Sequence, residues 1–415
     1  MFKVSKNCRL CLNKKIKVGL NLEKIPLGDK YSTVKSIAKK SPKFPLSLGW
    51  CNKCKNVQTM EIISPKLLWT DFTYLSSQTK GIVDHFRTVS KNIMSKFKLV
   101  KSDLIIDIGS NDGTFLKFFK NKNHPVLGVD PVKNIVKIAK KNGIKTIPEF
   151  FNLKVAKRIG KRKKAKVITC FNTFAHAPNM REILMSIKEI LADDGIFIFE
   201  CQYLSDIYRN GILGTIFHEH MYHHSVTSLT NFFKSFELDL FDVEKVNIQK
   251  GSIIGFVCKK NKRLISKSVR TFLQKEKLNG DTSYKKLINF KKFIDSQKKR
   301  AKKILRLNKT NKIGAFGSAR SGPTLAFNFG LDKSFDIFFD NHPLKVGKYS
   351  HFNGIKVLPT DEIPVLNPSI LIILAYLHSK KIIKNNLKYL KRGGKFLLVY
   401  PKINLVTIKN YNKFI

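Results

Sequence analysis

The apolar residues of this chain alternate between short continuous runs and longer segments in which they recur every three to four positions. Continuous runs typical of buried strands occur at residues 104–109, 126–130, 167–171 and 195–200. The segments between these runs are rich in Lys and Ile and predict helices. Strands that alternate with helices predict a parallel sheet with helices on both faces, the doubly wound α/β class. Residues 240–246 and 252–258 predict a pair of strands that closes this sheet in antiparallel orientation.

The same rhythm returns near the end of the chain, after a helical interval. Residues 262–308 carry Leu, Ile and Phe at helical spacing, with a break at 279–281, and predict packed linker helices. No heptad repeat is sustained there, which disfavours a free coiled coil. Residues 312–322 have the pattern of a strand, a glycine turn and a helix, and further strands are predicted at 335–340, 370–374 and 393–400. We therefore predict a second, smaller α/β unit of the Rossmann type.

A glycine turn after the first strand of the larger unit indicates ligand binding. This turn and the next strand hold six candidate cofactor-binding residues: Asp107, Gly109, Asn111, Asp112, Gly113 and Asp130. Asp130 lies 23 residues after Asp107, where a nucleoside-binding half-domain has the acid that accepts hydrogen bonds from ribose hydroxyls. The turn lacks the glycine spacing that suits a pyrophosphate, and its acids suit the cationic groups of S-adenosylmethionine (SAM). We predict SAM over NAD; the alternative is a doubly wound domain whose tight turn binds nothing.

Asn172 and His176 follow the predicted strand at residues 167–171. In a doubly wound sheet, residues at the carboxyl end of a strand beside the cofactor crevice face ligands. Asn172 is therefore a candidate cofactor-binding residue and His176 a candidate catalytic residue, although a lone His after an apolar strand is more often structural. The segment lacks the Asn/Asp-Pro-Pro-Tyr signature that grips an amine, which favours carbon or oxygen as a methyl acceptor.

The segment after residue 215 is dense in titratable side chains, among them His218, Glu219, His220 and Tyr222. Buried His and Glu must each find polar partners, so this density favours a catalytic loop over a hydrogen-bonded structural cluster. In an extended segment His218 and His220 would share one face and Glu219 would occupy the other. One histidine is then a candidate base, with Glu219 orienting a partner. A zinc-hydrolase His-Glu-x-x-His helix is excluded because Tyr222 occupies its last position.

Four of the seven cysteines form two Cys-x-x-Cys pairs: Cys8, Cys11, Cys51 and Cys54. Two such pairs predict a tetrahedral structural zinc site, and the 39 residues between them predict an inserted element. A redox role is disfavoured because no thioredoxin-like βαβ pattern surrounds either pair. We accordingly predict a zinc-binding module at residues 1–70, a SAM-binding domain at 71–260, a helical linker at 261–308 and a C-terminal Rossmann-like domain at 309–415.

The formal net charge of +49 comes mostly from Lys spread along the whole chain. Such a charge would ordinarily suggest a nucleic-acid partner, yet no Arg-rich groove with interleaved aromatic residues is present. We expect a solvated lysine surface whose field attracts a small anionic substrate. Because no apolar run reaches membrane-spanning length, we also expect no membrane association and a cytoplasmic location.

Several separated motifs together resemble the family of SAM-dependent C-methyltransferases that act on nucleotide-linked keto-deoxysugars. The resemblance is carried, in order, by the cysteine pairs and by residues 74–77, 106–113, 172–176, 217–220, 314–322 and 339–349. It implies a zinc-binding module, a class I methyltransferase domain and a C-terminal Rossmann-like domain, with the nucleotide sugar between the last two. It also implies that His220 is the base, with Glu219 beside it, and that Tyr74 and His176 belong to the same site.

The chain departs from the family pattern at two places. Phe217 stands where the family usually has Tyr, and residues 249–254, Gln-Lys-Gly-Ser-Ile-Ile, replace a His-Gly-Gly-Ser-Leu-Arg stretch. Candidate substrate-binding residues are His218, Tyr222 and Lys345. Lys345 follows the C-terminal glycine turn, which either cradles a diphosphate or is a structural remnant. NAD at that turn is a minor alternative, since Asp340 is the only acid near the required place.

The predicted chemistry is methylation of carbon. A neutral His220, with an ordinary pKa near 6.5, removes a proton from a sugar carbon next to a ketone, and the enolate carbon attacks the SAM methyl. Tyr74 or His176 donates hydrogen bonds to the ketone oxygen as charge develops on it. The alternatives are a zinc-containing RNA methyltransferase, which should show an aromatic, Arg-rich groove, and a nucleotide-binding oxidoreductase.

Overall fold

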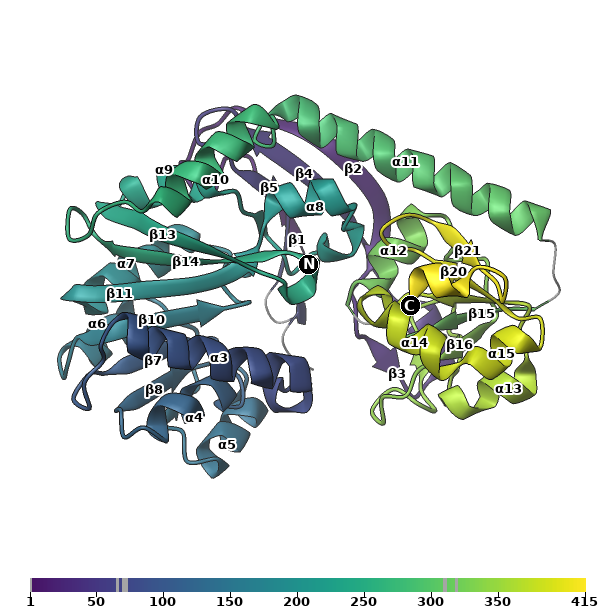
Figure 1. The fold of residues 1–415 in the computed structure, drawn as a ribbon, viewed down its shortest axis with the longest axis horizontal. Helices are drawn as coiled ribbons and strands as arrows, with labels where there is room; N and C mark the ends of the chain where they lie inside the picture. The colour runs from purple at the N-terminus through teal and green to yellow at the C-terminus, as the bar shows by residue number, and fades with distance from the viewer. Residues whose placement is uncertain (1, 65–66, 69–73, 309–311, 318–319) are drawn as a thin grey trace.

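The computed structural model describes residues 2–64, 67–68, 74–308, 312–317 and 320–415. The predicted domain boundaries at residues 70–71 and 309, and positions 318 and 319 of the C-terminal glycine turn, lie outside the described residues. Two lobes stand side by side, a long helix runs across the top, and the strands of the N-terminal module pass behind and between the lobes (Figure 1). The domain boundaries stay predictions.

A seven-stranded sheet forms the first lobe, with the strand order β13-β14-β11-β10-β7-β8-β9. Its parallel core consists of β7 (Ile105–Ile108), β8 (Val126–Val129), β9 (Thr146–Ile147), β10 (Ala165–Phe171) and β11 (Leu191–Gln202). The predicted pair of closing strands is present, because β14 (Ser252–Lys259) runs antiparallel between β11 and β13 (Leu238–Val246). The predicted doubly wound α/β sheet with its antiparallel closing pair is confirmed.

Helices cover both faces of this sheet. One face carries α3 (Lys80–Lys96) and α4 (Thr114–Lys120), and the other carries α6 (Leu153–Gly160), α7 (Met180–Ile190) and α9 (Val226–Lys234) (Figure 1). Each helix buries one apolar stripe: α3, for example, buries Phe86, Val89 and Ile93, three to four residues apart, against its neighbours. The polar faces of the helices carry much of the lysine predicted to be solvated.

The N-terminal module is built on a four-stranded sheet with the order β12-β5-β4-β2. β2 (Ile16–Pro26) and β4 (Lys43–Cys51) pair antiparallel, and two irregularities in their register bend the strands. β5 (Val57–Thr59) pairs with β4, and the fourth strand, β12 (Tyr222–His223), comes from the first lobe. The element predicted between the cysteine pairs therefore consists of β2, most of β4, the two-residue β3 (Tyr31–Ser32) and α1 (Lys35–Lys39).

Two helices, α10 (Lys267–Leu278) and α11 (Tyr284–Leu307), occupy the predicted helical interval, with the expected break at residues 279–281. α11 packs along β2. The Tyr284 hydroxyl donates to Val18 O over 3.0 Å, and Trp50 Nε1 donates to Thr282 O over 2.7 Å. These helices are thus packed rather than free. Among the described helices, none combines the length and the apolar composition needed to cross a bilayer.

The second lobe is a six-stranded sheet with the order β18-β16-β15-β19-β20-β21. Its strands are β15 (Ile313–Phe316), β16 (Ile337–Phe339), β18 (Val357–Leu358), β19 (Ile370–Ile373), β20 (Lys395–Leu398) and β21 (Asn404–Val406). All are parallel except β21, and numbered along the chain their order is 3-2-1-4-5-6, the order of the Rossmann fold, so the predicted Rossmann-like unit is present. A separate strand of this lobe, β17 (Tyr349–Ser350), pairs with β3, so the N-terminal module is joined to both lobes.

Candidate active site

The predicted glycine turn lies between β7 and α4, at the carboxyl edge of the larger sheet. Gly109 and Gly113 have φ angles of 74° and 79°, a region in which a side chain is strained. A Cβ on Gly109 would lie only 2.4 Å from Thr173 Oγ1, and one on Gly113 would lie 2.8 Å from a side-chain carbon of Ile144. The backbone of the turn therefore approaches its neighbours as closely as glycine alone permits.

Asp107 and Asp130 place two carboxyl groups at this edge. Asp130 accepts hydrogen bonds from the backbone N–H groups of Asn111, at 3.0 Å, and Val132, at 2.9 Å, which fix its orientation. Asp107 is 5% exposed and accepts from Thr169 Oγ1 at 2.6 Å. Burial raises the pKa of Asp107 to about 7; Thr169 opposes this shift and the charge of Asp130 adds to it. A buried carboxylate pair of this kind fits a cationic ligand with a ribose diol, as predicted for SAM.

Asn111 and Asp112 use their side chains to hold residues 74–77. Asn111 Oδ1 accepts from the N–H of Ser76 at 2.9 Å, and its Nδ2 donates to Tyr74 O at 3.0 Å. Asp112 Oδ2 accepts from the N–H of Ser77 at 3.0 Å. The geometry thus gives both residues a structural role, and their predicted contact with SAM stays a prediction.

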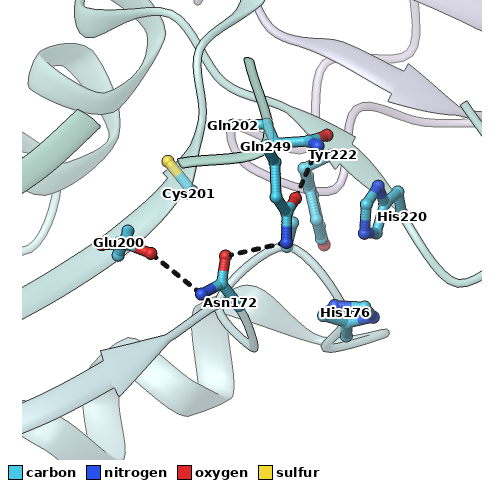
Figure 2. A pocket seen from close by; sticks show the side chains of 9 residues that line it. Asn172, His176, Glu200, Cys201, Gln202, His220, Tyr222 and Gln249 are labelled. Atoms are coloured by element: carbon cyan, nitrogen blue, oxygen red, sulfur yellow. Dashed lines mark hydrogen bonds between the residues drawn. The ribbon is translucent and has the colours of Figure 1, made fainter. Parts of the chain in front are cut away.

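A pocket opens where β10 and β11 end (Figure 2). Its lining residues are Asn172, Ala175, His176, Glu200, Cys201, Gln202, His220, Tyr222 and Gln249. Four of these were predicted as site residues from separate parts of the sequence: Asn172, His176, His220 and Tyr222. The fold therefore brings the loop after β10 and the histidine-rich loop together.

The imidazole rings of His176 and His220 meet edge to face, with centroids 4.9 Å apart. His220 Nδ1 lies 2.6 Å from Thr215 O, and because a carbonyl only accepts, Nδ1 carries the proton and Nε2 is the acceptor nitrogen. Burial lowers the pKa of His220 to about 4; the bond to Thr215 opposes this shift and Arg320 reinforces it. His220 is therefore neutral at pH 7. The ring of Phe217 lies 4.0 Å from that of His220, centroid to centroid.

Glu200 organises the opposite wall of the pocket. It is fully buried at the end of β11; its Oε1 accepts from Asn172 Nδ2 at 2.9 Å, and its Oε2 lies 2.5 Å from His85 Nε2 on α3. Gln249 Nε2 donates to Asn172 Oδ1 at 3.5 Å, and Gln202 Nε2 donates to Gln249 Oε1 at 2.7 Å, as Figure 2 shows. Sequence reasoning missed this network. Glu200 could have been found by the feature that identified Asp130, because each is an acid at the carboxyl end of a predicted strand.

Glu219 belongs to an ion-pair cluster between the two lobes. Arg320 Nη1 donates to Glu219 Oε2, and Arg320 Nε lies 3.7 Å from Asp29 Oδ2. Lys345 Nζ pairs with Asp29 Oδ1 at 2.8 Å. Burial raises the pKa of Glu219, and Arg320 opposes the shift. The partner predicted for Glu219 is thus Arg320, which sequence reasoning did not assign although it lies in the C-terminal glycine turn; Asp29 was missed as well.

His218 and Tyr74 do not reach the pocket. Residues 217–220 form a turn closed by the N–H of His220, which donates to Phe217 O at 2.9 Å, so the segment is not extended and the alternation of faces expected of an extended segment does not apply. His218 Nε2 instead lies 2.9 Å from Pro45 O in the N-terminal module. Tyr74 is 43% exposed beside the glycine turn and is not among the described residues that line the pocket.

The four predicted cysteine ligands converge. The sulfur atoms of Cys8, Cys11, Cys51 and Cys54 all lie within 4.8 Å of one another. Cys8 Sγ is 3.5 Å from Cys54 Sγ, and Cys11 Sγ is 3.6 Å from Cys51 Sγ. Tetrahedral zinc with Zn–S bonds of about 2.3 Å separates its sulfur ligands by about 3.8 Å, so the cluster fits the ion. Four protein ligands would fill the coordination sphere of a bound zinc ion, which is the arrangement of a structural site.

Comparisons with known protein families match the chain in three parts. Residues 8–69 match a family described as a putative zinc binding domain, residues 84–243 a methyltransferase domain, and residues 247–401 the C-methyltransferase C-terminal domain. The C-methyltransferase NovU of Streptomyces niveus is 27% identical over 381 residues, which are 88% of this chain and 89% of that protein. The uncharacterized protein MJ1252 of Methanocaldococcus jannaschii is 30% identical over 127 residues, which are 30% of this chain and 46% of that protein.

Two solved methyltransferase structures each align with less than half of the chain. A SAM-dependent methyltransferase from Clostridium acetobutylicum is 14% identical with a TM-score of 0.33, covering 47% of this chain and 96% of that one. The plantazolicin methyltransferase BpumL in complex with SAH is 13% identical with a TM-score of 0.35, covering 42% of this chain and 82% of that one.

Proposed function

We propose that this chain methylates a carbon of a nucleotide-linked keto-deoxysugar. It belongs to the family of C-methyltransferases that combine a zinc-binding module, a methyltransferase domain and a dedicated C-terminal domain. The observation that carries the proposal is the state of His220. Its Nδ1 proton is held by Thr215 O, its ring is neutral at pH 7, and the ring lines the pocket at the ends of β10 and β11. An imidazole in this state is ready to accept a proton at Nε2.

In the proposed reaction His220 Nε2 takes the proton from the sugar carbon next to the ketone. The carbon–hydrogen bond breaks, and its electron pair is delocalised onto the ketone oxygen. SAM supplies an electrophilic methyl group. The electron pair of the enolate forms the new carbon–carbon bond to this methyl group, and the electrons of the broken carbon–sulfur bond remain on sulfur, so that SAH leaves. The negative charge that develops on the ketone oxygen favours the protonated form of His220, which offsets the low pKa of the free imidazole.

His176 is placed to assist this step. Burial lowers the pKa of His176 well below its usual value, so the ring is neutral and carries one N–H. Its ring faces that of His220 at 4.9 Å, so a substrate carbon over His220 would bring the adjacent oxygen toward His176. A donor aimed at developing negative charge in a buried site contributes strongly to catalysis. Tyr74, the other predicted donor, would need residues 74–77 to move toward the pocket.

The carboxylates of Asp107 and Asp130 and the glycines of the turn are the groups that would hold SAM. Asp107 offers negative charge, and Asp130 has both oxygens oriented by backbone N–H groups, with lone pairs left for ribose hydroxyls. Asn172 lines the pocket and precedes Thr173, which lies against Gly109 of the turn, and the Asn172 side chain is fixed by Glu200 and Gln249.

Two cations at the carboxyl edge of the C-terminal sheet support an anionic nucleotide-linked substrate. Arg320 follows β15 and Lys345 follows β16, and both reach the cluster that contains Glu219, next to His220 in the chain. Ligands of doubly wound sheets bind at this edge. Asp29 and Glu219 hold the two cations at this place, where a diphosphate would meet them between the lobes.

The decisive experiment separates proton removal from methyl transfer. The protein is incubated in D₂O with SAH and a dTDP-linked 4-keto-deoxysugar, and exchange of the hydrogen next to the ketone is followed by NMR. We expect the wild type to exchange this hydrogen for deuterium with SAH and to form methylated product when SAM replaces SAH. We expect the His220→Asn variant to do neither. Methylation of RNA, or exchange that survives in His220→Asn, would contradict the proposal.

A further inference from the structure

The catalytic loop is an edge strand of the zinc module's own sheet. β12 pairs antiparallel with β5, placing Tyr222 opposite Gln58 and His223 opposite Val57. Thr59, at the end of β5, donates from its N–H to Met221 O at 3.1 Å and from its hydroxyl to His220 O at 2.7 Å. The backbone of the proposed base is therefore held by a residue of the N-terminal module.

Arg9 connects the cysteine cluster to the same loop. It lies between the ligands Cys8 and Cys11, and its Nη2 donates to Thr59 O at 2.8 Å and to Met221 O at 2.5 Å. Its guanidinium also lies over the ring of Tyr222, 4.9 Å from the centroid. A single planar side chain thus ties β5 and β12 together at the residue that follows His220.

A hydrogen-bond chain links the cluster to β5 by a second route. Asn56 Nδ2 lies 3.8 Å from Cys8 Sγ and donates to Gln58 Oε1 at 3.2 Å. The same oxygen accepts from the N–H of Arg9 at 2.9 Å. Asn56, Gln58 and Thr59 are fully buried, so water does not compete for these bonds. The position of Arg9 is in this way set by the conformation of the first cysteine pair.

We propose that Arg9 and Thr59 are positioning residues through which the four-cysteine site fixes the place of His220. The reaction that they serve is the proposed carbon methylation, but their effect on the loop can be measured without turnover. Zinc is then more than a support for folding of the first 60 residues: the geometry that it imposes on residues 8–11 extends through Arg9 to the pocket.

The test compares Arg9→Gln and Thr59→Val with the matched control Arg181→Gln. Arg181 lies on α7 and donates to Leu10 O at 2.8 Å, so it also ties the first cysteine pair to the methyltransferase lobe, but within the described part of the chain it makes no hydrogen bond to residues 220–224. Zinc content, SAM affinity, amide hydrogen exchange of residues 220–224 and the separate values of kcat and KM are measured for each variant. Arg9→Lys, which keeps the charge but loses the fork, serves as the conservative rescue.

We expect Arg9→Gln and Thr59→Val to keep their full zinc content and to bind SAM with an affinity within twofold of the wild type. Protection of the amides at 220–224 should fall at least tenfold, and kcat should fall about 10- to 100-fold with a smaller change in KM, since small misplacements of a base cost this much. Arg9→Lys should recover part of both losses, and Arg181→Gln should change neither.

Wild-type amide protection and kcat in zinc-loaded Arg9→Gln would overturn the inference, as would equal losses in Arg181→Gln. If Arg9→Gln loses zinc or fails to fold, Thr59→Val decides, because it lies outside the cysteine pairs and nearly keeps its shape. Failure of the proposed function would appear differently, because the wild type would then neither exchange the hydrogen of a keto-sugar nor methylate the sugar. The amide-exchange and zinc measurements would still report on the position of the loop.

Discussion

The Nδ1 atom of His220 lies 2.6 Å from the carbonyl oxygen of Thr215, five residues earlier in the same loop. This contact decides which ring nitrogen holds the proton, and so which one can receive another. Replacing His220 by Asn should keep the hydrogen bond to Thr215 O and remove the Nε2 atom that accepts the substrate proton.

For His220→Asn we expect loss of turnover by at least about a thousandfold, within the range for general-base removal, and SAM affinity within about twofold. Steady-state kinetics and calorimetric titration with SAM measure the two. His124→Asn is the control, because His124 lies just before β8, at the opposite edge of the sheet from the pocket. A His220→Asn enzyme with wild-type kcat would remove His220 from the mechanism.

The acid limb of the kcat/KM profile for the sugar should lie well below that of an exposed histidine, because kcat/KM reports the pKa of the base before the sugar binds. The pKa of His220 is lowered to about 4, so its neutral form persists as pH falls and kcat/KM is lost only as pH passes through that value. At pH 5.5, a base with an ordinary pKa near 6.5 would have lost about tenfold in kcat/KM, whereas this enzyme should keep most of it. Rates are measured at saturating SAM, and a midpoint at pH 6.5 or above would contradict the assignment.

The affinity for SAM should depend on pH through Asp107. Its pKa in the free protein is raised to about 7, and a bound cation lowers the pKa of a carboxyl group, so binding releases a proton below pH 7. The Kd for SAM should therefore rise about tenfold per pH unit on acidification below 7 and stay constant above it. Calorimetry in buffers of different ionisation enthalpy measures the released proton. Asp107→Asn should bind more weakly and show no such dependence; an unchanged pH dependence would assign it to another group.

Removing Arg320 should destabilise the protein because Glu219 is nearly buried and loses its partner. Loss of one member of a buried ion pair lowers the free energy of unfolding by about 3 kcal/mol, and Arg320→Gln is expected to do the same. The double variant Arg320→Gln/Glu219→Gln should recover much of the loss, since no buried charge remains. Urea unfolding of both single variants and the double variant gives the coupling free energy between Arg320 and Glu219. If the losses in the free energy of unfolding simply added, the two residues would not be coupled.

The elements of the first lobe could be predicted because the residues within each element specify its conformation. The apolar run at residues 104–108, the glycines at 109 and 113 and the acid at 130 each constrain their own few residues, and the structure has them as β7, a left-handed turn and the end of β8. The two cysteine pairs are similarly explicit, because thiolates in that spacing have one common use.

The interior of the site depends on contacts that no local pattern specifies. Glu219 meets Arg320 from a position 101 residues away, and His218 meets Pro45 from 173 residues away, because the N-terminal module and both lobes come together at this loop. The alternation rule failed at His218 because a tight turn replaced the extended segment on which the rule rests. Glu200 could have been found, since it follows the same end-of-strand logic as Asp130.

The two short ladders that join β5 to β12 and β3 to β17 also set an order of assembly. During synthesis the N-terminal strands are made first, yet one sheet edge is completed only when residues 222–223 emerge, and the second ladder waits for residues 349–350. The three parts are consequently poor candidates for recombination with those of a distant relative. An exchanged lobe would have to reproduce a neighbour's backbone register as well as its own fold.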